Sequence, residues 1–84
     1  MPRYSVVWLE IAEQQYRALA PDLRAEVERR IAALVENPTE PLDAVYNKHS
    51  DQWSIPLADR GFLFYAIVRA RAKLIILRVV VISP

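Results

Sequence analysis

The sequence predicts an α+β fold in which an N-terminal strand and an antiparallel two-helix hairpin precede a three- to four-stranded antiparallel sheet. Three observations predict it: apolar residues alternate at the N-terminus, recur at helical spacing up to residue 36, and alternate again after residue 52. Strands and helices thus fall into separate blocks, which is the pattern of helices packed on one face of a sheet. A chain of 84 residues has room for one domain, residues 1–84.

The N-terminal part of the chain is predicted to form one strand and two helices. Aromatic and β-branched residues alternate with others in the strand expected over residues 3–8. A helix is expected over residues 9–19, and Pro21 begins a second one, because proline has no N–H to donate and suits the first helical turn. The turn between them is short, so the two helices should lie antiparallel. Their core-facing positions are Trp8, Ala12, Tyr16, Leu19, Leu23, Val27, Ile31, Leu34 and Val35.

The second half of the chain holds the remaining strands, expected over residues 43–48 (a short strand or an irregular edge), 52–58, 62–68 and 73–82. Pro56 implies that its strand has a free edge or a bulge at that point, because proline cannot donate to the ladder. Asp59-Arg60-Gly61 is predicted to be a tight hairpin turn in which Gly61 is available for a positive φ. A polar turn over residues 69–72 joins the last two strands.

Both faces of the last two strands are apolar. Alternation over residues 73–82 predicts two apolar faces. One face holds Leu74, Ile76, Val80 and Ile82, and the other holds Ile75, Leu77, Val79 and Val81. Two helices cannot cover both faces of a sheet. At roughly 25 cal/mol per Å² of buried apolar area, a few hundred Å² left uncovered amounts to several kcal/mol of driving force for association. The pattern therefore predicts a second chain against the sheet.

Composition excludes several classes of protein. An apolar fraction of 54% with 25% charged residues excludes a disordered chain. The absence of cysteine excludes disulfides and thiolate zinc sites and fits a reducing cytoplasm, and a single histidine cannot build a structural metal site. No cofactor motif is present, nor an apolar run long enough for a membrane span, nor a signal peptide at Met1-Pro2-Arg3-Tyr4. The net charge of +1 does not favour nucleic acid, although every charged residue after Asp59 is basic.

Five motifs follow one another in order along nearly the whole chain. They are an Ala-rich helix ending in leucine (Ala12, Leu19), a second helix closing in Leu-x-x-x-Pro (Leu34 to Pro38), Trp53-Ser54-Ile55-Pro56-Leu57, a glycine turn into Phe62-Leu63-Phe64-Tyr65, and Ile75-Ile76-Leu77-Arg78-Val79. In this order and at these spacings the chain resembles the RelE/ParE toxin superfamily. The resemblance implies an antitoxin whose C-terminal arm wraps the toxin. It also implies either RelE-type cleavage of messenger RNA on the ribosome or ParE-type action on gyrase.

The chain departs from the pattern of the RelE-type ribonucleases. Ser54 and Pro56 stand where those enzymes place basic residues, and Gly61-Phe62-Leu63-Phe64-Tyr65 lacks the arginine of their Gly-x-Tyr-Arg-Leu-x-Tyr. The chain ends at Ile82-Ser83-Pro84, where family members continue into His-Arg and a tyrosine. RNA cleavage needs a group that activates the 2′-OH, a cation for the phosphate and an acid for the leaving oxygen. The resemblance therefore implies an altered, weakened or absent activity.

Four residues are the candidates for catalysis, and each has a second interpretation. Arg78 interrupts an apolar strand and either forms an ion pair with a carboxylate or contacts a phosphate or partner. Arg60, at a turn, is either a solvated charge or a substitute for the missing arginine. Lys48 and His49 precede the Trp53 strand, where they either face a groove or remain ordinary loop residues.

Three further features have structural readings. Trp53 and Tyr65 are expected in the core, with the Tyr65 hydroxyl at its rim. The basic turn over residues 69–73 is expected to be a solvated hairpin tip, or else a contact for an acidic antitoxin or a phosphate backbone.

The sequence therefore predicts a toxin-like component of a type II toxin-antitoxin module, neutralised by a cognate antitoxin. If its site is active, it inhibits translation as a ribosome-dependent mRNA endonuclease. The alternative is a ParE-like or catalytically degenerate binding module that acts on DNA gyrase or another protein. The expected partners are the antitoxin, then ribosome and mRNA or gyrase, with a homodimer as another way to cover the sheet. We expect a cytoplasmic protein with no cofactor and no membrane contact.

Overall fold

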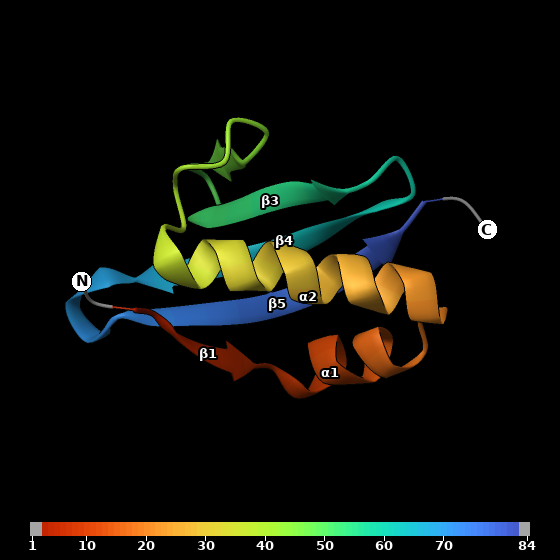
Figure 1. Cartoon of the computed structure of the whole chain (residues 1–84). Helices are drawn as coiled ribbons and strands as arrows, with labels where there is room; N and C mark the ends of the chain where they lie inside the picture. The colour runs from red at the N-terminus through yellow and green to blue at the C-terminus, as the bar shows by residue number, and fades with distance from the viewer. Residues whose placement is uncertain (1–2, 83–84) are drawn as a thin grey trace.

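The computed structural model describes residues 3–82, which form one five-stranded sheet flanked by two α-helices (Figure 1). Met1, Pro2, Ser83 and Pro84 lie outside the described residues, so the features predicted at the two chain ends fall partly beyond them. The elements in chain order are β1 (Ser5–Trp8), α1 (Glu10–Arg17), α2 (Pro21–Glu36), β2 (Val45–Asn47), β3 (Gln52–Leu57), β4 (Gly61–Val68), the 3₁₀ turn η1 (Arg69–Arg71) and β5 (Lys73–Val81).

The predicted α+β architecture is confirmed, and the sheet is larger than predicted. The strand order is β1-β5-β4-β3-β2, and all neighbours are antiparallel except β1 and β5, which run parallel. A parallel pair needs a long crossover, which the whole chain between β1 and β5 supplies. Because this pairing joins the first strand to the last, alternation within either strand carries no sign of it.

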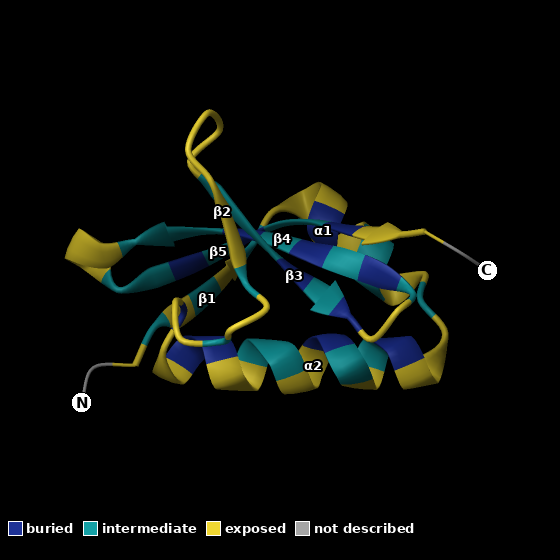
Figure 2. Ribbon diagram, turned by 90° about the horizontal axis from the view of Figure 1, so that it is seen from above, coloured by how far each residue is buried: buried dark blue, intermediate teal, exposed yellow. Residues whose placement is uncertain are grey.

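The helix α2 lies across one face of the sheet and builds the core. Figure 2 shows α2 along one side of the sheet, while the turn between β2 and β3 projects from the other side. The stripe predicted for α2 is confirmed: Leu23, Val27, Leu34 and Val35 are buried, and Ile31 packs against the core at its side. They cover buried side chains from three strands, which are Ile55, Leu57, Leu63, Tyr65, Leu74, Ile76 and Val79.

The helix α1 lies at the sheet edge rather than on the face, although it runs antiparallel to α2 as predicted (Figure 1). Where β1 ends, α1 takes its place beside β5. The Leu9 N–H donates to the Ile76 carbonyl at 3.1 Å, and the Gln15 side-chain oxygen accepts from the Val79 N–H at 2.7 Å. These contacts occupy backbone groups that an exposed edge strand would leave free for unwanted pairing. Only one helix therefore covers the face of the sheet.

The prediction that Gly61 takes a positive φ is wrong. The positive φ of the turn between β3 and β4 belongs to Ala58, at 55°, while Gly61 is a regular residue of β4 paired with Val81. A Cβ at Gly61 would lie 2.2 Å from the Val80 carbonyl oxygen. Glycine is needed here because β4 and β5 approach too closely for any side chain.

The hydroxyl of Tyr65 is buried inside the core, not at its rim. The residue is fully buried, and its hydroxyl donates to the Pro38 carbonyl at 2.9 Å. Trp53 is partly buried beside it, with the two rings stacked at a centroid distance of 6.3 Å. The hydrogen bond ties the end of α2 to the centre of the sheet, because Pro38 lies two residues after the helix ends at Glu36.

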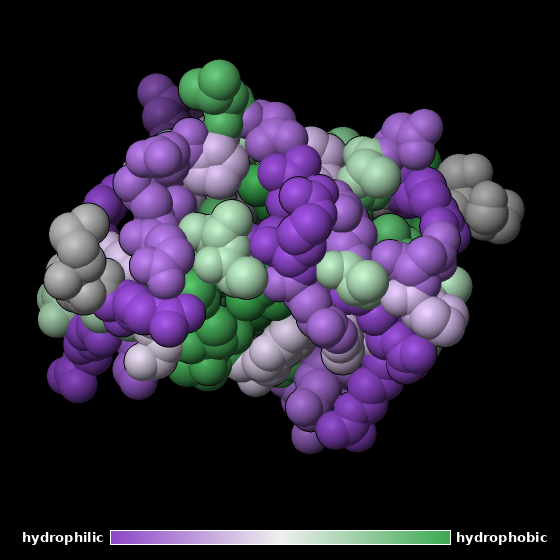
Figure 3. Space-filling view, in the orientation of Figure 1, coloured by the Kyte–Doolittle hydropathy of each residue, from purple (hydrophilic) through white to green (hydrophobic). Residues whose placement is uncertain are grey.

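The face of the molecule that carries α2 is mostly polar. Figure 3 shows hydrophilic side chains along the helix, interrupted by an apolar area beside it over β1. In the described part of the chain, no helix combines the length and the apolar character needed to cross a bilayer.

Candidate functional site

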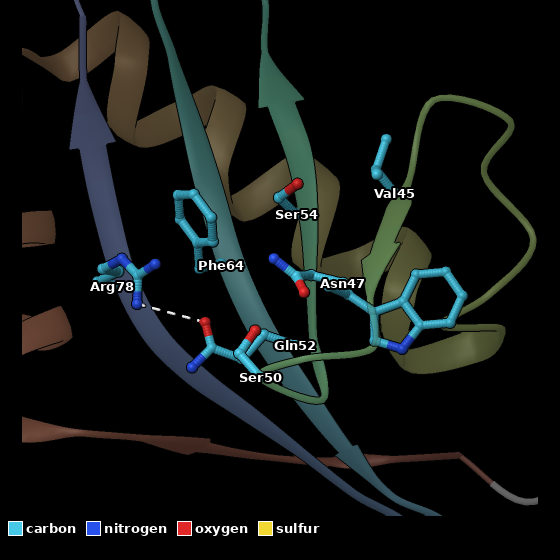
Figure 4. A pocket seen from close by; sticks show the side chains of 8 residues that line it. Val45, Asn47, Ser50, Gln52, Ser54, Phe64 and Arg78 are labelled. Carbon is cyan, nitrogen blue, oxygen red and sulfur yellow. Dashed lines mark hydrogen bonds between the residues drawn. The ribbon is translucent and has the colours of Figure 1, made fainter.

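Four strands contribute one row of side chains to the sheet face opposite α2, which we call the open face. The register pairs Val45 with Ser54, Ser54 with Phe64, and Phe64 with Arg78. Directly paired residues point to the same side of a sheet, so these four side chains form a continuous row. The helix layer lies behind this row (Figure 4), and neither of the two described α-helices lies on the side of the row.

A β-bulge turns Arg78 toward the open face. Phe64 pairs with Arg78 whereas the next residue, Tyr65, pairs with Ile76, so Leu77 has no partner in the register. One extra residue reverses the alternation beyond it. Val79 is therefore 4% exposed and belongs to the core, while Val80 is 37% exposed. The predicted grouping of Val80 with Leu74 and Ile76 on one face is wrong for this reason.

Arg78 has an aromatic partner and an amide partner, and not the carboxylate of the first of its two predicted interpretations. Its guanidinium carbon lies 4.0 Å from the centroid of the Phe64 ring, within the range of a cation–π interaction. One guanidinium N–H donates to the Gln52 side-chain oxygen at 3.4 Å. Among the described residues, no carboxylate lies within 4.0 Å of Arg78. The positive charge is thus held in place and left unneutralised.

A hollow of about 160 Å³ lies beside this pair, and we call it the Arg78 hollow. Figure 4 shows the Asn47 amide from β2 reaching toward the space between Phe64 and Ser54. The residues that line the hollow are Val45, Asn47, Ser50, Gln52, Trp53, Ser54, Phe64 and Arg78. Arg78 is the only ionisable group among them, and arginine does not release its proton near neutral pH. The lining can hold a negative charge and form hydrogen bonds, but it offers no group for proton transfer.

Lys48 and His49 lie beside the Arg78 hollow without lining it. Both are exposed in the turn between β2 and β3, directly between the lining residues Asn47 and Ser50. The His49 backbone N–H donates to the Asn47 side-chain oxygen at 2.9 Å. This bond fixes the Asn47 amide, while His49 itself lies in the turn next to the hollow and not in its lining.

Arg60 lies at the other end of β3 and has a structural partner. It pairs with Asp22 in the first turn of α2 at 2.7 Å. The hydrogen bond from Arg60 lowers the pKa of the Asp22 carboxyl. The length of β3 separates Arg60 from the turn that holds Lys48 and His49, about 20 Å at roughly 3.3 Å per residue. The four candidate residues therefore do not line one groove, and Arg78 is the one that lines the hollow.

The two residues of β3 that depart from the ribonuclease pattern, Ser54 and Pro56, both lie on the open face. Ser54 lines the Arg78 hollow, and Pro56 follows on the same face at a point where β2 no longer pairs with β3. No motif in the sequence marks Asn47, Ser50, Gln52 or Phe64 as site residues. The one hint in the sequence is that the polar residues Gln52 and Ser54 alternate with the apolar residues of their strand, which places both on the same face.

The charge of the sheet is entirely positive. None of the five strands contains an aspartate or glutamate, and their only charged residues are Lys73 and Arg78. Arg69 and Arg71 in η1 are exposed at the end of β4 and, in the described part of the chain, pair with no carboxylate. No cluster of three or more histidine, aspartate or glutamate side chains suited to a metal ion occurs within residues 3–82.

No protein-family model and no curated protein matches this sequence. The structure, in contrast, is similar to solved toxins. The toxin-antitoxin complex RelBE2 of Mycobacterium tuberculosis contains a chain that is 22% identical with a TM-score of 0.78, over 95% of this chain and 99% of that one. The isolated RelE toxin of E. coli is 16% identical with a TM-score of 0.81, over 96% of this chain and 86% of that one. The YoeB/ParE toxin of Agrobacterium tumefaciens is 12% identical with a TM-score of 0.77, over 94% of this chain and 99% of that one.

At these identities the similarity establishes the fold. It extends over at least 94% of this chain and at least 86% of the other chain in each comparison. The resemblance stated from the motifs predicted the same fold. This chain has the fold of the RelE/ParE toxins.

Proposed function

We propose that this protein is the toxin component of a type II toxin-antitoxin module and is neutralised by an antitoxin. The observation that carries the proposal is the open face, a row of aromatic and apolar side chains around an unneutralised arginine on a sheet that α2 covers from one side only. Similar folds occur in the RelBE complex of E. coli and the RelE-RelB complex of Pyrococcus horikoshii. A second copy of the chain is the other occupant that would cover this face.

The target that we propose first is messenger RNA on the ribosome, in the cytoplasm. Arg78 would stabilise the negative charge that develops on the phosphate during cleavage. Since the lining of the Arg78 hollow offers no proton-transfer group, His49 and Lys48 in the adjoining turn would have to supply it. Arg60 is the weakest of the four candidates, because its guanidinium is engaged with Asp22.

A second candidate function is binding to DNA gyrase or another protein without catalysis. The observation that favours it is the same lining, in which the single ionisable group is an arginine. A site of this composition can recognise an anion but cannot move a proton.

Expression of the full chain, with and without the protein encoded beside it, tests both functions. We expect growth arrest that the neighbouring protein relieves, with message cleavage in ribosome-bound mRNA and unchanged plasmid supercoiling. Arg78→Ala and His49→Ala should each remove cleavage, whereas Arg60→Ala, the matched control among the candidates, should retain it. Arrest with intact messages and altered supercoiling would replace the nuclease by the gyrase function. No arrest in any host background would contradict the toxin proposal.

A further inference from the structure

We infer that β2 is a self-pairing edge, on which a second copy of this chain adds its own β2 in antiparallel orientation around Tyr46. Such a dimer needs neither RNA nor an antitoxin and goes beyond the proposed function. β2 (Val45–Asn47) lies at one end of the strand order and pairs with β3 alone. Figure 2 shows it exposed. A strand in this position presents a row of backbone groups to any chain that can pair with it.

The outer side of β2 is unpaired in both its backbone and its side chains. Within residues 3–82, no backbone–backbone hydrogen bond reaches β2 from any element other than β3. The Val45 side chain is 61% exposed and that of Tyr46 is 46% exposed. Proteins usually protect an edge of this kind with a charge or a proline in the strand. β2 contains neither, so its edge is uncharged and open to pairing.

An aromatic row runs across the sheet and ends at this edge. The register pairs Tyr65 with Trp53, and Trp53 with Tyr46. The rings of Trp53 and Tyr65 stack at 6.3 Å between centroids, and those of Tyr46 and Trp53 lie 5.1 Å apart. Cross-strand aromatic pairs are among the contacts that stabilise a sheet. In the described part of the chain Tyr46 has such a neighbour on one side only, and a second Tyr46 would supply the other.

Geometry restricts the register of two identical antiparallel strands. Directly opposed residues of a sheet point to the same face, so a residue can oppose only itself or a residue an even number of positions away. The register that sets Tyr46 opposite Tyr46 pairs all three residues of β2, because Val45 then lies opposite Asn47 of the second copy. The resulting contact is isologous, since both copies use the same residues.

The charges that flank β2 favour this orientation. Asp43 precedes the strand, whereas Lys48 and His49 follow it. In the register centred on Tyr46, Asp43 lies opposite His49 of the second copy, and the same pair recurs on the other side of the axis. Asp43 already accepts from Arg30 at 2.7 Å, but a carboxylate has room for further donors. A parallel arrangement would instead set like charges side by side, which destabilises a sheet.

Self-pairing would also join the two open faces. Val45 and Asn47 line the Arg78 hollow, and the two-fold axis sets each of them beside the other in the second copy. The two hollows would therefore open on the same side of one continuous sheet, with five strands from each copy. Because only a short strand is shared, we expect a weak interface of less than about 1,200 Å² and a dissociation constant on the order of 100 µM.

Sedimentation equilibrium of the full chain from about 10 µM to about 1 mM tests the dimer. Tyr46→Lys and Tyr46→Glu should each weaken it by at least about tenfold, because each sets like charges opposite one another across the axis. An equal mixture of the two variants should dimerise again, since lysine then faces glutamate, and this recovery shows that both variants fold. The matched control is Ile11→Lys, at a residue that is 53% exposed in α1, which should dimerise like the unmodified chain.

The absence of cysteine from the chain allows a second test, which reads the register. Opposed residues of antiparallel strands have Cα atoms about 4.5 to 5.5 Å apart, which a disulfide spans, whereas diagonal neighbours at about 7 to 8 Å exceed its reach. In oxidised glutathione, Tyr46→Cys should form a covalent dimer about tenfold faster than Val45→Cys or Ile11→Cys. Val45→Cys mixed with Asn47→Cys should match Tyr46→Cys.

Four outcomes would overturn the self-pairing edge. The first is a chain that stays monomeric at about 1 mM, and the second is a dimer that survives both Tyr46→Lys and Tyr46→Glu. The third is equal cross-linking of the three single-cysteine variants, which would indicate chance collisions. The fourth is a chain that pairs at β2 only after the proposed antitoxin is added, which would assign the edge to that protein. Growth arrest enters none of these measurements, so the proposed function holds or fails separately.

Discussion

One buried hydroxyl, that of Tyr65, links the centre of the sheet to the end of α2. Tyr65 is fully buried, and its one hydrogen bond goes to the Pro38 carbonyl beyond the helix. Burial raises the pKa of its phenol to about 12, and the nearby Asp43 carboxylate adds to the rise. A raised pKa means that the folded state favours the protonated phenol. The stabilisation is therefore complete below the ordinary pKa of about 10 and is lost as the pH rises toward 12.

Tyr65→Phe should reverse its effect on stability between neutral and alkaline pH. At pH 8 the variant loses one buried hydrogen bond and should be about 1 kcal/mol less stable to urea. Between pH 8 and pH 11 the unmodified chain should lose about 1.4 kcal/mol that the variant cannot lose, because one pKa unit corresponds to about 1.36 kcal/mol. The difference should vanish or change sign at pH 11.

The control for this measurement is Ile55→Val, a substitution in the same core that removes no titratable group, so its effect on stability should be the same at pH 8 and pH 11. An alkaline loss of equal size in Tyr65→Phe and in the unmodified chain would mean that the buried phenol does not control it. Urea midpoints at both pH values suffice for the comparison, provided that the slopes of the transitions agree.

At single positions, the sequence indicated which residues are unusual better than it indicated which residues they contact. Arg78 stood out because a charge interrupts an apolar strand, and the structure places it in the hollow. A carboxylate was one of its two predicted partners, and a phosphate or a binding partner was the other; within the described residues Arg78 contacts the Phe64 ring and the Gln52 amide. The roles of Lys48, His49, Arg60 and Arg78 in catalysis stay predictions. Gly61 was recognised as special for the wrong reason, since a close approach between strands has no local signature.

At the scale of elements, one unpaired residue decides which side of β5 is core. Leu77 has no partner in the register, so Val79 faces α2 and Val80 faces outward. Alternation fixes the faces of a strand only as long as the pairing is unbroken. The helices and most strand positions could be read from periodicity, whereas the bulge depends on pairing with β4 and could not.

Alanine substitutions at the adjacent valines test the bulge. Val79→Ala should cost about 2 kcal/mol of unfolding free energy, because it removes two buried methyl groups and leaves a cavity. Val80→Ala should cost less than about 0.5 kcal/mol, as surface substitutions usually do. Chemical denaturation at neutral pH measures both. The reverse order would mean that Val80 faces α2 and that Arg78 does not reach the open face.

At the scale of the whole molecule, the sheet has one covered and one open side. α2 covers one face and α1 covers an edge, which leaves Phe62, Phe64 and Val80 on the other face with only the β2–β3 turn nearby (Figure 2). The sequence predicted this imbalance from strands that are apolar front and back. It could not predict how far the open face is polar, because Arg78 and Ser54 reach it through the bulge and the register.

A partner that covers the open face should bring apolar side chains against Phe62, Phe64 and Val80 and a carboxylate for Arg78, because Arg78 is the one charged residue of the hollow and pairs with no carboxylate among the described residues. Val80→Lys should therefore weaken binding of the proposed antitoxin by about a hundredfold, because it puts a second charge among apolar side chains that the partner would bury. Leu42→Lys provides the control, since Leu42 is fully exposed in the loop before β2, away from this face. Calorimetric titration of the purified proteins gives both affinities and the heat-capacity change, which should be negative when apolar surface is buried. Equal affinities for the two lysine variants, with both folded, would place the partner on another surface and leave the open face without an occupant.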